Sequence, residues 1–343
     1  MTDRATNDRD TSRRTARASE NGIRIRLFDA DRTDRTLTFD EALKAKASAR
    51  QLLWIDVDGD LESEQHRAIV EKFDFDKATA RELAEHGGRP HVQLHGDHFH
   101  IRVAAEPDSD HPERVRWLDI VAGPNLVISR HPEPLAFLGA INERIAADAS
   151  IGQLDSAEFV ASVLDSIVTT YHTAVDALED QLDAIDANAL ARPQADDLFP
   201  KLVAIRRRIG KLRRLLADHR ELFGALGRPD FGRGVESADP DVFAPVSSRF
   251  EAAILSLEAT RDAVVGSFDI LMTRTAQRTN DVMRVLTLAT VLFLPATVTA
   301  GFLGMNVIVP VPNDDPASFW VILGFVLLFE ITVVAVAKWR RWI

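Results

Sequence analysis

The 343-residue sequence contains no cysteine, which excludes a disulfide scaffold, a thiolate metal site and a thiol nucleophile. It also lacks a basic excess. The 52 acidic and 41 basic residues give a formal net charge of -11, which argues against a general nucleic-acid-binding protein. The sequence has no GxxxxGK phosphate loop, no HExxH helix and no recognisable catalytic triad. We therefore expect neither an enzyme, nor ATP coupling, nor a bound cofactor.

Charged residues are nearly absent from two segments near the end of the chain. Residues 285–313 contain no charged side chain, and residues 318–337 contain only Glu330. A helix needs about 20 predominantly apolar residues to cross a bilayer. Two buried core helices are the alternative, but a charge-free run of this length is rare in soluble proteins. The pattern predicts two transmembrane helices.

The residues beside these spans predict their orientation. Basic residues precede the first span and follow the second: Arg274, Arg278, Arg284, Lys338, Arg340 and Arg341. Because cytoplasmic flanks carry an excess of lysine and arginine, we expect a multi-pass protein of the cytoplasmic membrane with both termini inside. Trp320 and Trp339 lie at the two ends of the second span, where aromatic belts form. We interpret Glu330 as a side chain near the interface, and a part in transport chemistry is the alternative.

Before the spans, the sequence predicts an α+β organisation. Alternating or β-rich segments indicate strands at residues 23–28, 52–57, 91–94, 98–104, 115–122 and 126–129, and helical patterns occupy residues 39–49, 61–73 and 77–86. From residue 151 onward the pattern is wholly helical. The expected division is a disordered tail (1–21), a cytoplasmic α/β domain (22–150), a helical hairpin with a stalk helix (151–283), a first span (284–306), an outer loop (307–317), a second span (318–337) and a basic tail (338–343).

The helical part separates its charges. Residues 155–197 hold ten acids and one base, whereas residues 198–220 hold eight bases and one acid. This favours an antiparallel hairpin with the acidic helix along the basic one, although two separately solvated faces would give the same pattern. After a loop over residues 227–245, one helix is expected to run from about Val246 to Leu303, because a proline inside a membrane span is tolerated.

One face of that long helix carries polar residues into the first span. Asn280, Met283, Thr287, Thr290, Leu294, Thr297 and Gly301 follow one another at steps of three and four. Such a stripe facing lipid would leave hydrogen-bonding groups unused. It could face a neighbouring helix or line a pore, and the pattern alone does not decide between them. A single hairpin cannot enclose a pore, so the pore interpretation requires an oligomer.

The first span ends in Gly304, Met305 and Asn306, and these residues carry a family resemblance. A GMN tripeptide after a proline-containing span, followed by a short outer loop and a C-terminal second span, resembles the CorA family of divalent-cation channels. The resemblance extends over NDVMRVLTLATVLFLPATVTAGFLGMN and, upstream, over TRDAVVGSFD, LLWIDV, GGRPHVQLHGDHFHIRV and VAGPNLVISRH. It covers residues 23–343 and includes ZntB-type zinc transporters in the same superfamily.

The resemblance implies a homopentameric funnel in the bilayer, with five first spans around a pore that passes Mg²⁺, or Co²⁺ or Ni²⁺. Gly304, Met305 and Asn306 would form the selectivity filter, with Asn306 meeting the hydrated ion. Neutral oxygens suit this role, because Mg²⁺ dehydrates reluctantly. The pore-lining residues would be Asn280, Met283, Leu286, Thr287, Leu294, Thr297 and Gly301. Asp269 falls where the family has a carboxylate near the cytoplasmic pore end.

The sequence departs from the family at two places. The outer loop reads VIVPVPNDDPASF in place of the family's Met-Pro-Glu-Leu element, and Asp314 and Asp315 are its candidates for an acidic, cation-attracting ring. The family's regulatory aspartate falls on Pro245. Asp239 and Asp241 could substitute for it only if the loop is shifted.

A histidine cluster supports an alternative. His86, His91, His95, His98 and His100 lie within fifteen residues, and imidazole suits zinc, nickel or cobalt. Ordinary surface and core histidines would give the same pattern. The cluster keeps a ZntB-like, proton-coupled zinc transporter as the alternative function. A membrane-anchored sensor without transport is disfavoured, because it would need neither the GMN motif nor the polar stripe.

Overall fold

The structure is a computed structural model that describes residues 22–31, 34–48, 50–85, 87–107, 115–147, 155–191, 197–231, 240–305 and 316–340. The chain divides into two compact units. The first comprises Met1–Ile185 and Pro200–Val265, and the second comprises Asp186–Phe199 and Gly266–Ile343. Helix α8 (Pro240–Leu303) belongs to both units and runs without a break. The uninterrupted helix predicted from the sequence is confirmed.

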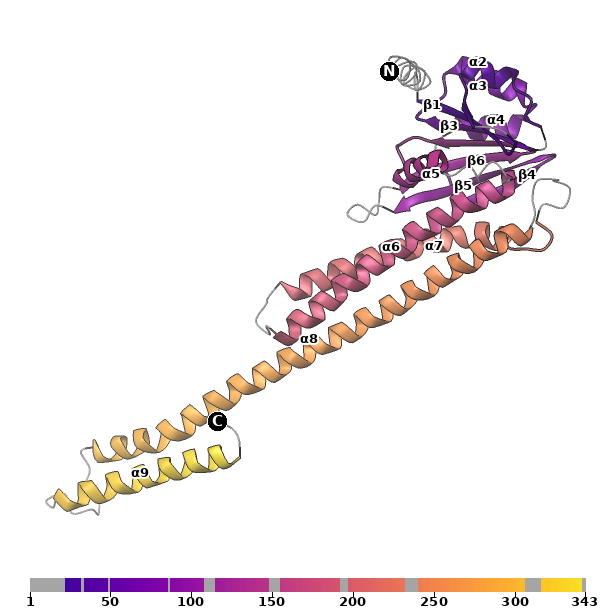
Figure 1. Ribbon diagram of the computed structural model, residues 1–343. Coiled ribbons are helices and arrows are strands. Elements are labelled where there is room, and N and C mark those ends of the chain that lie inside the picture. The colour runs from indigo at the N-terminus through magenta and orange to yellow at the C-terminus, as the bar shows by residue number, and fades with distance from the viewer. Residues whose placement is uncertain are drawn as a thin grey trace, which may run out of the picture. The chain divides into compact units, whose positions relative to one another are not determined.

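The first unit contains a seven-stranded mixed sheet (Figure 1). Its strands are β1 (Ile23–Asp29), β2 (Arg35–Thr36), β3 (Gln51–Asp58), β4 (His91–His95), β5 (His98–Pro107), β6 (Val115–Gly123) and β7 (Leu126–His131). The spatial order is β2-β1-β3-β7-β6-β5-β4, in which only β3 and β7 pair in parallel. The six strands expected from the sequence are all present, and β2 is an addition of two residues.

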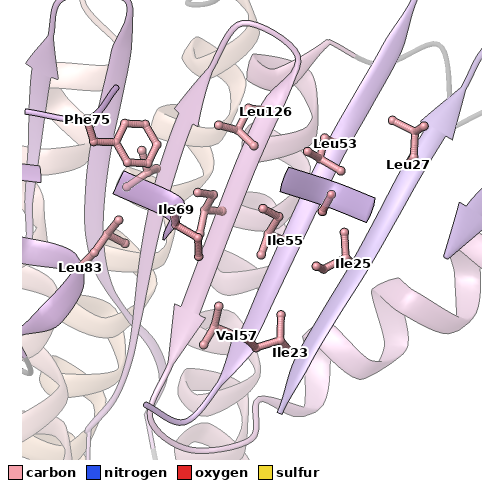
Figure 2. Packing of buried hydrophobic residues seen from close by; sticks show 13 residues of the cluster. Ile23, Ile25, Leu27, Leu53, Ile55, Val57, Ile69, Phe75, Leu83 and Leu126 are labelled. Carbon is pink, nitrogen blue, oxygen red and sulfur yellow. The ribbon is translucent and has the colours of Figure 1, made fainter. Parts of the chain in front are cut away.

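One face of this sheet is apolar where β1, β3 and β7 lie. Ile25, Ile55 and Ile128 point to this face, because successive side chains in a strand alternate between its two sides. The face is covered by α2 (Phe39–Lys44), α3 (Ser63–Lys72) and α4 (Lys77–Ala84). Ile69 of α3 and Leu83 of α4 are buried in the same cluster, as Figure 2 shows. The local sequence thus builds one core layer from strand alternation and short amphipathic helices.

The other face of the sheet packs on long helices. These are α6 (Ser156–Ala191), α7 (Leu198–Leu226) and the beginning of α8. The ring of Trp54 lies 5.1 Å from that of Phe159, and its Nε1 donates a hydrogen bond of 2.9 Å to Ser129. The Phe99 ring is 6.1 Å from that of Phe243. Helix α5 (Ala136–Ala147), which the sequence reasoning did not name, follows β7.

Helices α6 and α7 are consecutive and lie side by side, as the charge pattern predicts (Figure 1). Arg208 of α7 donates a 2.8 Å hydrogen bond to Gln181 of α6. The ion pairs of the next arginines run to α8, however: Arg213 to Glu258 at 2.5 Å and Arg220 to Glu251 at 3.1 Å. The basic helix therefore also neutralises acids of the third helix, which the prediction of a two-helix pairing had left out.

The start of α8 corrects the expected loop boundary. The helix begins at Pro240, whereas Val246 was expected. Proline is favoured at the first helical position, since its missing N–H is one that has no partner in the helix anyway. Pro245 then lies exposed in the second turn of α8. The residue that replaces the family's regulatory aspartate is therefore helical.

The second unit contains the end of α8 and helix α9 (Pro316–Trp339). By length and composition, both helices are apolar enough to cross a membrane. In the most apolar 18-residue window of each, 0% of α8 and 6% of α9 is buried within the structure. Core helices of a soluble domain would be covered, so this exposure argues against the alternative of two buried core helices.

Candidate functional site

Helix α9 covers one face of the end of α8. Residues of both helices, among them Leu288 and Phe329, line a shared cavity of about 370 Å³. On α8 the half-buried positions recur at helical spacing: Leu288, Ala289, Leu292, Pro295, Ala296 and Thr299. At 100° per residue these positions define one side of the helix. This side is the one that packing within the described residues half-covers. Leu288 also lines the cavity shared with α9, together with Thr287 and Val291.

Most of the predicted pore-lining stripe lies on roughly the opposite side of α8 from these half-buried positions. Thr287 is the exception, because it also lines the cavity shared with α9. Every member of the stripe is exposed in the single chain: Asn280, Met283, Leu286, Thr287, Leu294, Thr297 and Gly301. Met283 is 54% exposed and Leu294 is 60% exposed. Packing among the described residues therefore leaves the stripe exposed and available to a neighbouring molecule or to a water-filled space.

The threonines of this stripe satisfy their hydroxyl groups within α8. Thr287 donates to the carbonyl oxygen of Met283 at 2.7 Å, and Thr297 donates to that of Phe293 at 2.8 Å. Thr290, which follows the same spacing, donates to Leu286 at 2.9 Å. A hydroxyl group that donates its hydrogen bond to a helix carbonyl still has lone pairs that can accept hydrogen bonds. The stripe thus presents neutral oxygens beside apolar side chains.

The GMN tripeptide begins where α8 ends. Gly304 donates its N–H to the carbonyl oxygen of Ala300 at 2.9 Å, and a Cβ at position 304 would come within 3.1 Å of that same oxygen. Glycine is therefore favoured at this helix end by close backbone approach. Met305 is exposed at 54%. Asn306, the residue predicted to meet the ion, lies outside the described residues.

The structure describes two of the predicted acidic residues, and they lie far apart on α8. Asp241 lies in the first turn of α8, and Asp269 lies about eight turns further along the same helix; both are exposed. Asp239, Asp314 and Asp315 lie outside the described residues. Glu330 is half-buried on α9.

The α/β domain contains a buried ionic network that the sequence reasoning missed. Asp56, 1% exposed, accepts hydrogen bonds from Arg24 at 2.8 Å and Ser129 at 2.6 Å, and lies 3.3 Å from Nε2 of His131. Burial opposes ionisation of Asp56, but the hydrogen bond and charge of His131 outweigh it and lower the pKa of the carboxyl. Burial likewise opposes protonation of His131, whose pKa is nevertheless raised by Asp56. From the sequence, the segments that form β1, β3 and β7 had indicated strands but not this network.

The matched family model is that of the CorA-like Mg2+ transporter protein, and it spans residues 49–338. Because this match covers most of the chain, the protein belongs to that family. The family consists of membrane transporters with two C-terminal helices, and its members are not enzymes. The resemblance inferred from the GMN motif is thereby confirmed.

Individual relatives share modest sequence identity. A cobalt/magnesium transport protein CorA of Thermotoga maritima is 22% identical over 298 residues, which are 84% of this chain and 83% of that protein. The divalent cation transporter CmaX of Pseudomonas aeruginosa is 28% identical over 231 residues, 66% of this chain and 69% of that protein. The complete structure of the CorA magnesium transporter from Methanocaldococcus jannaschii matches with a TM-score of 0.70 at 19% identity, covering 93% of this chain and 98% of that one. The shared fold includes the mixed sheet, the long helix and the two apolar helices.

Proposed function

We propose that this protein carries Mg²⁺ through a pore formed by the exposed stripe of α8 in a homopentamer. The observation that supports this most directly is the exposure of the stripe, most of which lies on the side of α8 away from its half-buried positions. A face of mixed polarity on a membrane-spanning helix is costly in lipid, and it is used when it lines a pore. Because one helix cannot enclose a pore, the proposal requires several copies of the chain.

The chemistry of the stripe fits a hydrated hard cation. Mg²⁺ releases its water reluctantly, so neutral oxygens such as those of Thr287 and Thr297 can hold the hydration shell without trapping the ion. Met283 and Leu294 would form apolar constrictions that gate by dewetting. An inside-negative potential of 100 mV favours the entry of a divalent ion by about 4.6 kcal/mol, since each charge contributes about 2.3 kcal/mol. No energy source other than the ion gradient is needed.

The proposed filter is Gly304, Met305 and Asn306, with the Asn306 side chains forming a ring at the outer mouth. Orientation with both termini in the cytoplasm belongs to the same proposal, as do Asp269 at the inner end of the pore and Asp314 and Asp315 at the outer mouth. The ZntB-like alternative uses the same pathway for Zn²⁺. The GMN motif is common to both, so the choice between the metals depends on transport data.

Ion flux into liposomes that contain the purified protein tests the filter. Asn306→Ala should abolish Mg²⁺ flux while the oligomer remains intact by size-exclusion chromatography, because the ring loses its oxygens. Asn313→Ala is the matched control, an asparagine of the outer loop outside the motif. Wild-type flux in Asn306→Ala would show that the filter assignment is wrong. Flux of Zn²⁺ that exceeds that of Mg²⁺ and depends on a pH gradient would establish the zinc alternative.

A further inference from the structure

Three side chains from separate elements meet beneath α4. They are Glu82 of α4, His91 of the edge strand β4 and His100 of β5, and one potential ligand atom from each lies within 4.8 Å of the others. Nδ1 of His100 is 2.6 Å from Oε2 of Glu82, and Nε2 of His91 is 3.7 Å from Oε1 of Glu82. The side chain of His100 is 0% exposed, that of Glu82 is 13% exposed and that of His91 is 25% exposed. Neither the pore proposal nor the hydrophobic core uses this cluster.

The local fold holds the three residues together. Arg102 donates to the backbone carbonyl oxygens of Glu82 at 2.9 Å and Gly87 at 2.7 Å, which fixes the end of α4 on the sheet. Gly87 and Gly88 both have positive φ, at 79° and 129°, and an added Cβ on Gly88 would meet Arg102 at 3.1 Å. These backbone conformations, which glycine adopts readily, lie in the segment between α4 and β4, after which His91 lies beside Glu82.

The hydrogen bonds of the two imidazoles define which nitrogens can bind an ion. Nε2 of His100 lies 3.1 Å from Oδ1 of Asp119, and the same oxygen accepts a 2.6 Å hydrogen bond from Arg102. Nδ1 of His91 lies 2.9 Å from the carbonyl oxygen of Arg89. Since both partners are acceptors, these ring nitrogens carry the protons. In the neutral rings, Nδ1 of His100 and Nε2 of His91 are left with lone pairs that face the carboxylate of Glu82.

Three lone-pair donors facing one another require a cation or a proton between them. Within the described part of the chain, Oε2 of Glu82, Nε2 of His91 and Nδ1 of His100 are buried and make no hydrogen bond of acceptable geometry. The 2.6 Å separation of His100 and Glu82 meets the distance of an ion pair but not the directionality of a hydrogen bond. A proton could serve one imidazole, whereas a divalent cation would serve all three groups.

We propose that Glu82, His91 and His100 form a site for a borderline transition-metal ion, with Zn²⁺ as the best match. Two imidazoles and one carboxylate are a common zinc set, with bond lengths of about 2.0–2.2 Å, and the fourth position is then open to water. Tetrahedral bonds of this length place ligand atoms about 3.3 Å apart. This spacing lies between the 2.6 Å that separates His100 from Glu82 and the 3.7 Å that separates His91 from Glu82. Metal-bound histidines characteristically donate their other N–H to a carboxylate or a backbone carbonyl, as His100 and His91 do.

The ligand set distinguishes this site from the pathway of the proposed function. Mg²⁺ prefers an all-oxygen shell, whereas nitrogen donors favour Zn²⁺, Co²⁺ or Ni²⁺. The site links the edge hairpin of β4 and β5 to α4, so bound metal would fasten these elements. It does not depend on which ion crosses the membrane.

Equilibrium dialysis of the full-length, chelator-treated protein against Zn²⁺ in millimolar Mg²⁺ tests the proposal. We expect one more zinc per chain in the wild type than in Glu82→Gln or His91→Ala. The affinity for Zn²⁺ should fall by more than the roughly 10- to 100-fold that is lost when a residue hydrogen-bonded to a metal ligand is removed. His95→Ala is the matched control, because His95 lies on the same face of β4 and its Nδ1 is 3.1 Å from Asp76. Glu82→Gln is isosteric and keeps the backbone carbonyl that Arg102 binds.

Hydrogen exchange provides the second measurement. Zn²⁺ should slow amide exchange in α4 and β4 of the wild type and of His95→Ala, but not of Glu82→Gln, while the metal-free proteins should exchange alike. Equal zinc binding by the wild type and Glu82→Gln would overturn the proposal, as would displacement of the zinc by Mg²⁺. A wild type that binds no additional zinc would also overturn it.

Discussion

Acidification should loosen the attachment of the sheet to the helices at His219. This side chain of α7 is buried, with Nδ1 donating to the carbonyl oxygen of Leu215 at 2.7 Å and Nε2 accepting the N–H of Ala104 in β5 at 2.8 Å. These bonds need a neutral ring, because a protonated Nε2 could not accept. Burial lowers the pKa of His219 to about 4, against the smaller opposing effects of the Leu215 carbonyl and Asp218.

The magnitude follows from linkage. The pKa is lowered in the folded state, so the unfolded chain takes up the proton first. The contribution of His219 to the free energy of unfolding is therefore fully present above its unfolded pKa of about 6.5. This contribution is lost as the pH falls toward the folded pKa. At pH 5 the expected loss is about 2 kcal/mol, rising to about 3 kcal/mol below pH 4.

Hydrogen exchange of the β5 amides in the full-length protein measures this loss. After correction for intrinsic exchange rates, the opening free energy at Ala104 should fall by about 2 kcal/mol between pH 7.5 and pH 5. His219→Gln keeps an acceptor that does not titrate, so the pH dependence due to this position should disappear. His219→Phe, which also lacks a titrating group but leaves the Ala104 N–H without its acceptor, should be destabilised at both pH values. An unchanged pH slope in His219→Gln would refute the reasoning.

The remaining predictions concern the ionic network and α8. Asp56→Asn should lower stability by about 3 kcal/mol in thermal unfolding, because His131 loses its buried counter-charge. The wild-type pair should stabilise most between about pH 4 and pH 6.5, since the contribution of Asp56 is lost at lower pH and that of His131 at higher pH; a flat wild-type profile would contradict this. Gly266→Pro should uncouple ion regulation from transport and lower the free energy of unfolding by about 3 kcal/mol, because proline breaks the helix. The control Gly266→Ala should do neither, because an added Cβ meets no atom within 4 Å. Normal regulation in Gly266→Pro would exclude a continuous-helix gate. Asp241→Asn and Asp269→Asn should each shift the inhibitory Mg²⁺ concentration by at most about fivefold, as expected for exposed carboxylates, and complete loss of inhibition from either would reveal a dominant sensor.

The fold was largely predictable because its elements carry strong local patterns. Strand alternation located six strands, and charge-free length located the two apolar helices. The boundary at Pro240 was missed because a proline-containing, acidic segment is typical of both a loop and a helix start. Strand β2 has only two residues, too few for any periodicity.

The candidate sites were predictable only in part. Spacing alone defined the stripe that includes Thr287 and Thr297, but the face that α9 covers depends on packing between distant segments. Five histidines in fifteen residues were visible in the sequence. That His91 and His100 meet Glu82 was not, because the convergence depends on the register of β4 on β5 and on the turn at Gly87.

The two proposed sites use opposite solutions to the problem of holding a divalent cation. Along α8, neutral oxygens and apolar side chains can bind an ion only through its water, so the ion passes and does not stay. Beneath α4, two imidazole nitrogens and a carboxylate, each oriented by its surroundings, replace the water and retain the ion. The same ion cannot be the optimum for both. Excess Mg²⁺ should therefore occupy the pathway along α8 while leaving zinc at Glu82, His91 and His100 in place. The two sites can then be studied separately in one preparation of the protein.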